Sequence, residues 1–184
     1  MYKIVLLSGS PAQQSKSNRI LQHLSQQLSD SGFQTRLIGV RDFNPEALLY
    51  AHIKDESIQD FITELADADA FVLATPIYKG TFTGAVKTVL DILPQYALKH
   101  KVVLPIATGG SMAHLLAMDY SIKPVLSILG SSDILQGVFI SDHQISVSSS
   151  GDFVLDDDIQ NRLDESVHHL TKAVRQKISQ EQIL

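Results

Sequence analysis

Hydroxyl and amide side chains gather in one stretch near the start of the chain, between an apolar run at residues 4–7 and a helical pattern from residue 20. A strand that ends in such a turn and leads into a helix forms an anion site, because the first N–H groups of the helix lack partners and its dipole adds positive potential. Lys16 and Arg19 add to that potential. The stretch predicts a phosphate-binding loop. Its candidate donors are Ser8, Ser10, Ser15, Ser17 and Asn18.

A plainer interpretation of this stretch is that Ser17 or Asn18 caps a helix, which is the commoner role of such residues. The stretch alone would favour that interpretation. Two nucleotide motifs are also excluded, since the chain contains neither G-x-G-x-x-G nor G-x-x-x-x-G-K-[ST]. What remains is a loop for a phosphate monoester, and other loops of the chain have to decide between the two interpretations.

A second candidate loop covers residues 75–84 and follows another apolar run. Pro76 lacks an N–H and fixes the turn, while Gly80 and Gly84 permit close backbone approach. Such a segment can lie along a planar heterocycle, with Ile77 or Tyr78 against its face. Phe82 is expected to dock a helix instead of a ligand.

A third candidate loop, Thr108-Gly109-Gly110-Ser111, also follows an apolar run. Paired glycines can form a plain turn, or they can let the chain pass under a ring without a Cβ clash. Each loop is weak evidence separately. All three at one edge of a sheet would favour a ligand that has a phosphate and a flat ring, and FMN has both.

The pattern of apolar residues places these loops on alternating strands and helices. Residues 41–57 are expected to be irregular, and Pro124 interrupts the fourth helical pattern. Strands are expected at residues 2–8, 33–40, 70–75 (ended by Pro76), 101–108 and 133–141, and helices at residues 17–31, 57–68, 82–93, 112–129 and 156–177.

Strand–helix alternation at this spacing predicts an α/β fold with a five-stranded parallel sheet between two helical layers. A phosphate loop after the first strand indicates the flavodoxin-like strand order 2-1-3-4-5, with the ligand at the carboxyl edge of the sheet. We expect residues 1–184 to form a single domain, since no linker or repeat divides them.

The three loops together resemble those of the NADPH-dependent FMN reductases, in particular the flavin reductase component of two-component alkanesulfonate monooxygenase systems. The resemblance covers roughly residues 1–139. The segments that carry it are Gly9-Ser10-Pro11 with Ser15-Lys16-Ser17, residues 45–51, residues 74–80, residues 84–91, residues 107–111, residues 113–120 and residues 123–126.

This resemblance implies an enzyme that transfers a hydride from NADPH, or less readily NADH, to FMN and supplies the reduced FMN to a partner monooxygenase. It implies no catalytic side chain, because the cofactor carries the chemistry. Lys79 is the nearest cation for charge on the reduced ring. The residues expected around the phosphate are Ser8, Ser10, Pro11, Ser15, Ser17 and Asn18; those along the isoalloxazine are Pro76, Ile77, Tyr78, Lys79 and Gly80, with Gly109, Gly110 and Ser111 against it.

The resemblance also assigns Tyr120 to a π-type bulge at a tetramer interface, so we expect a homodimer or homotetramer. Pro124 independently predicts an irregular helix near residues 118–124, because it lacks an N–H and clashes with the preceding turn. A proline kink with a surface tyrosine is the competing interpretation.

The composition limits the partners of the chain. It has 184 residues, 44% hydrophobic and 19% charged, a net charge of −5 and no cysteine. Nucleic acid and acidic membranes are therefore poor partners, and disulfides or cysteine metal sites are impossible. With no leader and no apolar run near the ~20 residues that span a bilayer, we expect a cytoplasmic protein.

Several other residues suggest chemistry that we do not assign. The acidic residues at 156–158 suit a helix start better than a metal, and His168 and His169 suit a solvated face. His114 is expected to make a polar contact at a helix start. A hydrolase triad with Ser10 and His114 is rejected, because G-x-S-x-G is absent.

Two competing functions stay open at the level of sequence. One is a quinone, azo-dye or chromate reductase with tightly bound FMN, which differs from an FMN exporter in its flavin off-rate. The other is a flavodoxin-like electron carrier. That class usually flanks its ring with aromatic residues and has a strongly acidic face, whereas this chain has no Trp and a net charge of only −5.

Overall fold

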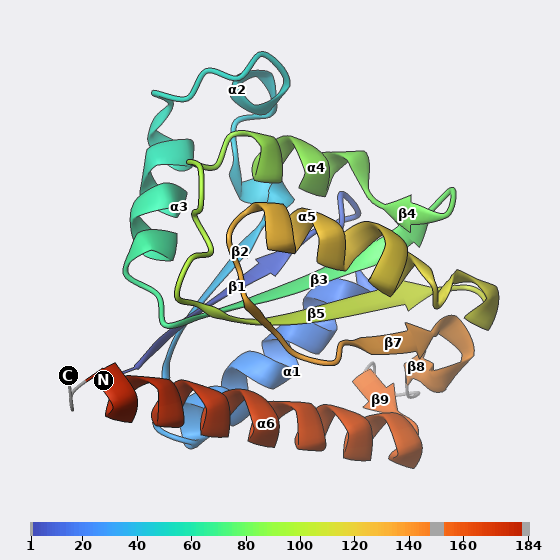
Figure 1. The fold of residues 1–184 in the computed structure, drawn as a ribbon. Helices are drawn as coiled ribbons and strands as arrows, with labels where there is room; N and C mark the ends of the chain where they lie inside the picture. The colour runs from blue at the N-terminus through green and yellow to red at the C-terminus, as the bar shows by residue number, and fades with distance from the viewer. Residues whose placement is uncertain (1, 148–152, 182–184) are drawn as a thin grey trace.

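The computed structural model describes residues 2–147 and 153–181, and its centre is a mostly parallel sheet (Figure 1). The strands follow the order β2-β1-β3-β5, and both β6 and β7 continue the sheet by pairing with β5. This is the predicted flavodoxin-like order with the fifth position divided between two short strands. The strands are β1 (Lys3–Ser8), β2 (Gln34–Gly39), β3 (Ala70–Tyr78), β5 (Val102–Gly109), β6 (Asp133–Ile134) and β7 (Val138–Ser141).

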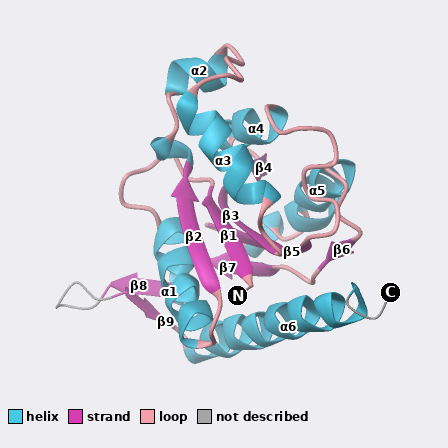
Figure 2. Cartoon of the chain, turned by 90° about the vertical axis from the view of Figure 1, so that its left-hand side faces the viewer, coloured by secondary structure: helices cyan, strands magenta, loops and turns pink. Residues whose placement is uncertain are grey.

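Helices cover both faces of the sheet, which confirms the three-layer prediction (Figures 1 and 2). One face packs against α1 (Lys16–Asp30) and α6 (Asp157–Glu181). The other face packs against α3 (Glu56–Ala66), α4 (Gly84–Asp91) and α5 (Lys123–Ile128). The short helix α2 (Pro45–Leu49) precedes α3. None of the helices in the described ranges combines the length and the apolar character that crossing a bilayer requires.

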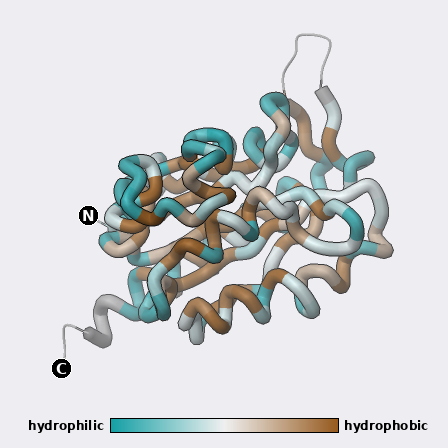
Figure 3. Tube along the Cα trace, turned by 90° about the horizontal axis from the view of Figure 1, so that it is seen from above, coloured by the Kyte–Doolittle hydropathy of each residue, from teal (hydrophilic) through white to brown (hydrophobic). Residues whose placement is uncertain are grey.

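Each central strand is buried on both faces because its side chains alternate between two apolar clusters. In β1, Ile4 and Leu6 join the cluster under α1 and α6, whereas Val5 and Leu7 join the cluster under α3 and α4. Hydrophobic segments accordingly run through the middle of the molecule (Figure 3). The continuous apolar runs of the sequence therefore do reflect double burial.

Two predicted boundaries around the second loop are wrong. Strand β3 does not end at Pro76 but continues to Tyr78. Because β1 ends opposite Ala74, that edge of β3 has no partner strand at Pro76, and the missing N–H of the proline breaks no hydrogen bond to β1. The predicted helix at 82–93 starts at Gly84, and Phe82 lies in strand β4 (Thr81–Phe82), which pairs with β3.

The long helical pattern at residues 112–129 is divided into three pieces. A 3-10 turn spans Met112–His114, a π-helix spans Met118–Ile122 and α5 begins at Lys123. Pro124 is the second residue of α5 and follows the π-helix almost directly, so its missing N–H falls at the junction of these two pieces. The irregularity predicted near residues 118–124 is confirmed, and it is a π-helix that contains Tyr120.

The structure also contains elements that were not predicted. A 3-10 turn (Val40–Asp42) and α2 occupy part of the stretch that was expected to be irregular. A hairpin of β8 (Ile145–Val147) and β9 (Phe153–Leu155) separates β7 from α6.

A buried lysine joins α3 to the amino-terminal edge of the sheet. The ammonium group of Lys101 donates to the backbone oxygens of Ala66 (3.0 Å), the last residue of α3, and of Ala68 (2.7 Å), which follows the helix. Burial lowers the pKa of Lys101 below its ordinary value of 10.5, and the nearby carboxylates of Asp69 and Asp67 oppose that shift.

Candidate functional site

The loop between β1 and α1, residues 9–15, is here called loop 1, and it ends in a capped helix. The Ser15 hydroxyl accepts from the backbone N–H of Asn18 at 3.3 Å, so Ser15 is the N-cap of α1, and neither Ser17 nor Asn18 is. The Ser10 hydroxyl accepts from the N–H of Ala12 at 3.2 Å. The first turn of α1 contains no acidic residue. The helix therefore presents uncompensated N–H dipoles at loop 1.

Loop 1 is held against β3 and α4 by its first residue. Gly9 donates to the backbone oxygen of Ala74 at 2.7 Å and accepts from the Thr83 hydroxyl at 2.6 Å. A Cβ on Gly9 would lie 2.4 Å from Val86 Cγ2 and 3.0 Å from Thr75 Cβ. Only glycine fits there, and this contact fixes where loop 1 lies relative to β3.

The second loop lies at the end of β3. Ile77 is buried, whereas the side chain of Tyr78 is 49% exposed. Lys79 (φ 53°) and Gly80 (φ 86°) both have positive φ and form the two-residue turn between β3 and β4. Two positive φ angles are typical of a type I′ hairpin turn, so Gly80 supplies backbone freedom here and not a close approach.

The third loop begins with the last two residues of β5 and is tied to loop 1. The Thr108 hydroxyl lies 3.0 Å from the Ser17 hydroxyl, and both side chains are buried. A Cβ on Gly109 would lie 3.0 Å from Phe139 Cζ, so the chain passes closely over β7. Ser111 accepts from the N–H of Ala113 at 3.2 Å and caps the 3-10 turn.

These three loops line one cavity of about 270 Å³, here called the central pocket. The site residues predicted from sequence that line it are Ser10, Ser15, Ser17, Pro76, Ile77, Tyr78, Gly109 and Gly110. The lining residues that were not assigned to the site from sequence are Ala12, Gln14, Lys16, Thr108 and Asp142. Pro11, Lys79, Gly80 and Ser111 do not line it.

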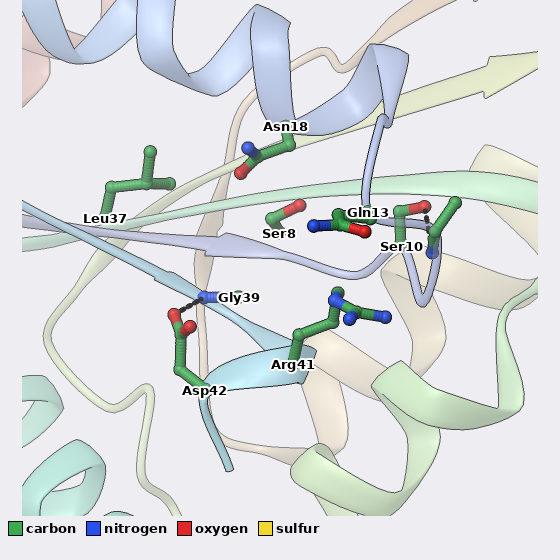
Figure 4. Close-up of a pocket in the computed structure, with 9 residues that line it drawn as sticks. Ser8, Ser10, Gln13, Asn18, Leu37, Gly39, Arg41 and Asp42 are labelled. Atoms are coloured by element: carbon green, nitrogen blue, oxygen red, sulfur yellow. Dashed lines mark hydrogen bonds between the residues drawn. The ribbon is translucent and has the colours of Figure 1, made fainter.

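A second cavity of about 280 Å³, here called the flanking pocket, lies on the β2 side of loop 1 (Figure 4). Ser8 and Asn18 line this cavity instead of the central pocket, and Ser10 lines both. The buried Ser8 hydroxyl has no hydrogen-bond partner within the described part of the chain. Arg41 also lines the flanking pocket and donates to the backbone oxygen of Pro11 at 2.9 Å. The predicted phosphate donors are thus divided between the two sides of loop 1.

Asp142 is the lining residue that lies outside the three predicted loops. It follows β7, and its carboxylate lies 2.9 Å from the ammonium group of Lys16. The same ammonium donates to the backbone oxygen of Asp142 at 3.0 Å. The feature of the sequence that could indicate Asp142 as a site residue is its place after the fifth strand, because the carboxyl end of that strand lies at the same sheet edge as the other loops.

His114 lies beside the third loop but lines neither cavity. Its Nδ1 is buried without a hydrogen-bond partner among the described residues, and it lies 3.5 Å from the place that a Cβ on Gly109 would take. His114 is also the last residue of the 3-10 turn that Ser111 caps. It therefore packs under the third loop.

The donor set of the central pocket fits a phosphate monoester joined to a flat ring. Hydroxyls, backbone N–H groups and the Lys16 ammonium are the donors that a phosphate accepts from. Pro76 and Ile77 offer an apolar wall, and Gly109 and Gly110 offer bare backbone. FMN has a group for each part of this lining.

Comparison with known proteins agrees with this chemistry. Residues 2–146 match the family described as NADPH-dependent FMN reductase. The chain is 48% identical over 143 residues to the FMN reductase (NADPH) of Pseudomonas putida KT2440, which covers 78% of this chain and 73% of that protein. It is 44% identical over 143 residues to the FMN reductase (NADPH) of Escherichia coli K12, and that alignment covers 78% of this chain and 75% of that protein.

Solved structures agree as well. The apo form of an NADH:FMN oxidoreductase (EMOB) superposes with a TM-score of 0.85 at 37% identity, over 94% of this chain and 90% of that one. A flavodoxin from the domain Archaea has a TM-score of 0.57 at 10% identity, over 94% and 99%, and shows the fold alone. Sequence, fold and relatives agree: this chain is an oxidoreductase that belongs to the NADPH-dependent FMN reductase family.

Proposed function

We propose that this reductase binds FMN in the central pocket, reduces it with NADPH, and releases the reduced FMN to a partner monooxygenase of the sulfonate-assimilation type. NADH serves as a poorer donor. The observation that carries the proposal is the single cavity lined by the loops after β1, β3 and β5. The division of its lining into phosphate donors and flat apolar walls supports FMN as the ligand.

The residues of this chain bind and orient the two substrates. Ser10, Ser15, Lys16 and Ser17 hold the phosphate, and Gly109 and Gly110 lie along the ring. Pro76 and Ile77 pack against the ring and exclude water, and Tyr78 covers its outer part. FMN, when bound, accepts the hydride of the nicotinamide, so no side chain has to act as acid or base at the reacting atoms.

Reduced FMN as a released product is supported by the relatives. The proteins of Pseudomonas putida KT2440 and Escherichia coli K12 are named as reductases of FMN. A Pseudomonas putida protein named NADH-dependent FMN reductase SfnE is 36% identical over 91 residues, half of this chain. These names treat FMN as a substrate, which favours an enzyme that exports it.

Residues 1–184 act as one domain in this proposal, and the enzyme assembles as a homodimer or homotetramer through the π-helix. Tyr120, in the π-helix, is 80% exposed and Leu116, two residues before that helix, is 61% exposed, although both side chains are large and mostly apolar. A second copy of the chain would remove this surface from water.

A reporter monooxygenase tests the release of reduced FMN. Purified protein, NADPH and FMN are mixed with bacterial luciferase and a long-chain aldehyde in air, and light is recorded. Chemically reduced FMN serves as the positive control for the reporter. Light that requires all of NADPH, FMN and the protein is expected. NADPH oxidation in the presence of FMN without light would contradict release.

A further inference from the structure

Two residues in the lining of the central pocket, Lys16 and Asp142, form an ion pair. Lys16, the first residue of α1, reaches the turn after β7, where its ammonium donates to both the carboxylate (2.9 Å) and the backbone oxygen (3.0 Å) of Asp142. Both residues line the cavity. Two of the three N–H donors of Lys16 are therefore used within the protein.

The carboxylate of Asp142 is also close to the third loop. A Cβ on Gly110 would lie 3.7 Å from Asp142 Oδ2. The carboxylate therefore stands between the start of α1 and the glycines that follow β5. A negative charge is favourable there, because the first turn of α1 has no acidic residue of its own.

We propose that Asp142 and the phosphate of FMN compete for Lys16, so that Asp142 lowers the affinity of the enzyme for FMN. This inference rests on the proposed function, because it requires the FMN phosphate to bind at loop 1. The phosphate must attract Lys16 away from a carboxylate that already neutralises it. Asp142 thereby favours release of the flavin over its retention.

The strength of the pair is suited to such a competition. The side chains of Lys16 and Asp142 are 42% and 51% exposed, so solvent screens their attraction. A phosphate accepts more hydrogen bonds than the carboxylate and has more charge. FMN therefore still binds, but less tightly than it would with Lys16 unpaired.

Asp142→Asn tests the proposal, because it keeps the shape of the side chain and removes its charge. Equilibrium dialysis of flavin-free protein gives the dissociation constants for FMN and for riboflavin, which lacks the phosphate. We expect FMN to bind about three- to tenfold more tightly to the variant, the scale of a partly exposed charge contact, and riboflavin affinity to stay unchanged. The control is Asp91→Asn, which removes the same charge from an exposed Lys87–Asp91 pair outside the pocket lining and should change neither constant.

A second background separates competition for Lys16 from simple repulsion. In Lys16→Gln, the Asp142→Asn substitution should raise FMN affinity less than about twofold, since there is no ammonium left to release. An equal gain in FMN affinity in both backgrounds, or no gain in either, would overturn the proposal. The proposed function would still stand in that case, provided that the unsubstituted protein binds FMN. Absence of FMN binding to the unsubstituted protein would overturn both.

Discussion

The hydroxyl of Ser17, in the first turn of α1, lies 3.0 Å from the hydroxyl of Thr108, near the end of β5. Both side chains are buried, and one of them follows loop 1 while the other begins the third loop. This contact joins two loops that are 91 residues apart in sequence. This pair of hydroxyl groups therefore helps to fix the position of the phosphate donors relative to the bare glycine backbone.

Ser17→Ala should lower the free energy of unfolding by about 1–3 kcal/mol, because the buried Thr108 hydroxyl loses this partner. FMN affinity should fall as well. Urea unfolding of Ser17→Ala, Thr108→Val and the double variant measures the coupling between them. Fully additive losses would contradict a direct interaction between the two hydroxyls.

Gly9→Ala should destabilise the protein by about 1–3 kcal/mol, the usual cost of overpacking a tight site. The added Cβ would lie 2.4 Å from Val86 Cγ2, and the resulting shift of loop 1 should weaken FMN binding. The matched control is Gly84→Ala at the start of α4, where a Cβ meets nothing within 4 Å. In thermal unfolding, the melting temperature of the control should equal or slightly exceed that of the unsubstituted protein. Equal stability of the two variants would contradict the packing argument.

Tyr120→Ala should reduce the assembled mass of the protein or its retention of flavin, because Tyr120 is exposed on the π-helix and is proposed to lie at an interface. Sedimentation velocity measures the mass. Tyr50→Ala removes an equally large exposed ring from the end of α2 and serves as the control. An unaltered mass and flavin content in Tyr120→Ala would leave a surface tyrosine beside a proline as the better interpretation.

The buried Lys101 makes stability depend on alkaline pH. Its pKa is lowered by burial, so between that pKa and 10.5 the unfolded chain binds a proton that the folded chain has lost. The free energy of unfolding should therefore rise with pH across this window. Lys101→Met should be less stable overall, since two backbone oxygens lose their donor, and it should lack this rise. Chemical unfolding at several pH values gives the free energy of unfolding as a function of pH, and Lys99→Met, at an exposed lysine, is the control. The same pH dependence in the unsubstituted protein and both variants would contradict the role of Lys101.

Much of the site could be predicted from sequence because parallel strands bring their carboxyl ends to one edge. The apolar runs of β1, β3 and β5 determine which loops meet, and Pro124 predicts an irregular helix. These are local signals, and the fold preserves them. They were enough to bring together eight of the predicted lining residues.

Other features depend on tertiary contacts that no local pattern shows. The turn at Lys79 needs a positive φ at a residue other than glycine, which no local pattern indicates. The sequence therefore predicts a helix at Phe82, where the structure has β4. Gly137 lies between β6 and β7, where a Cβ would meet Met118 Cε at 2.0 Å and the Pro105 oxygen at 2.6 Å. Gly137 thus stands at the break that divides the fifth strand into β6 and β7, and Asp142 follows β7.

The most direct test of the central claim is NADPH oxidation by purified protein that has been freed of flavin. The rate is measured without FMN, with one equivalent of FMN, and with increasing excess, each with and without a quinone. We predict no turnover without FMN and a rate that rises with added FMN until the enzyme is saturated. Turnover that needs only one equivalent of FMN plus the quinone, or no oxidation under any condition, would contradict the account.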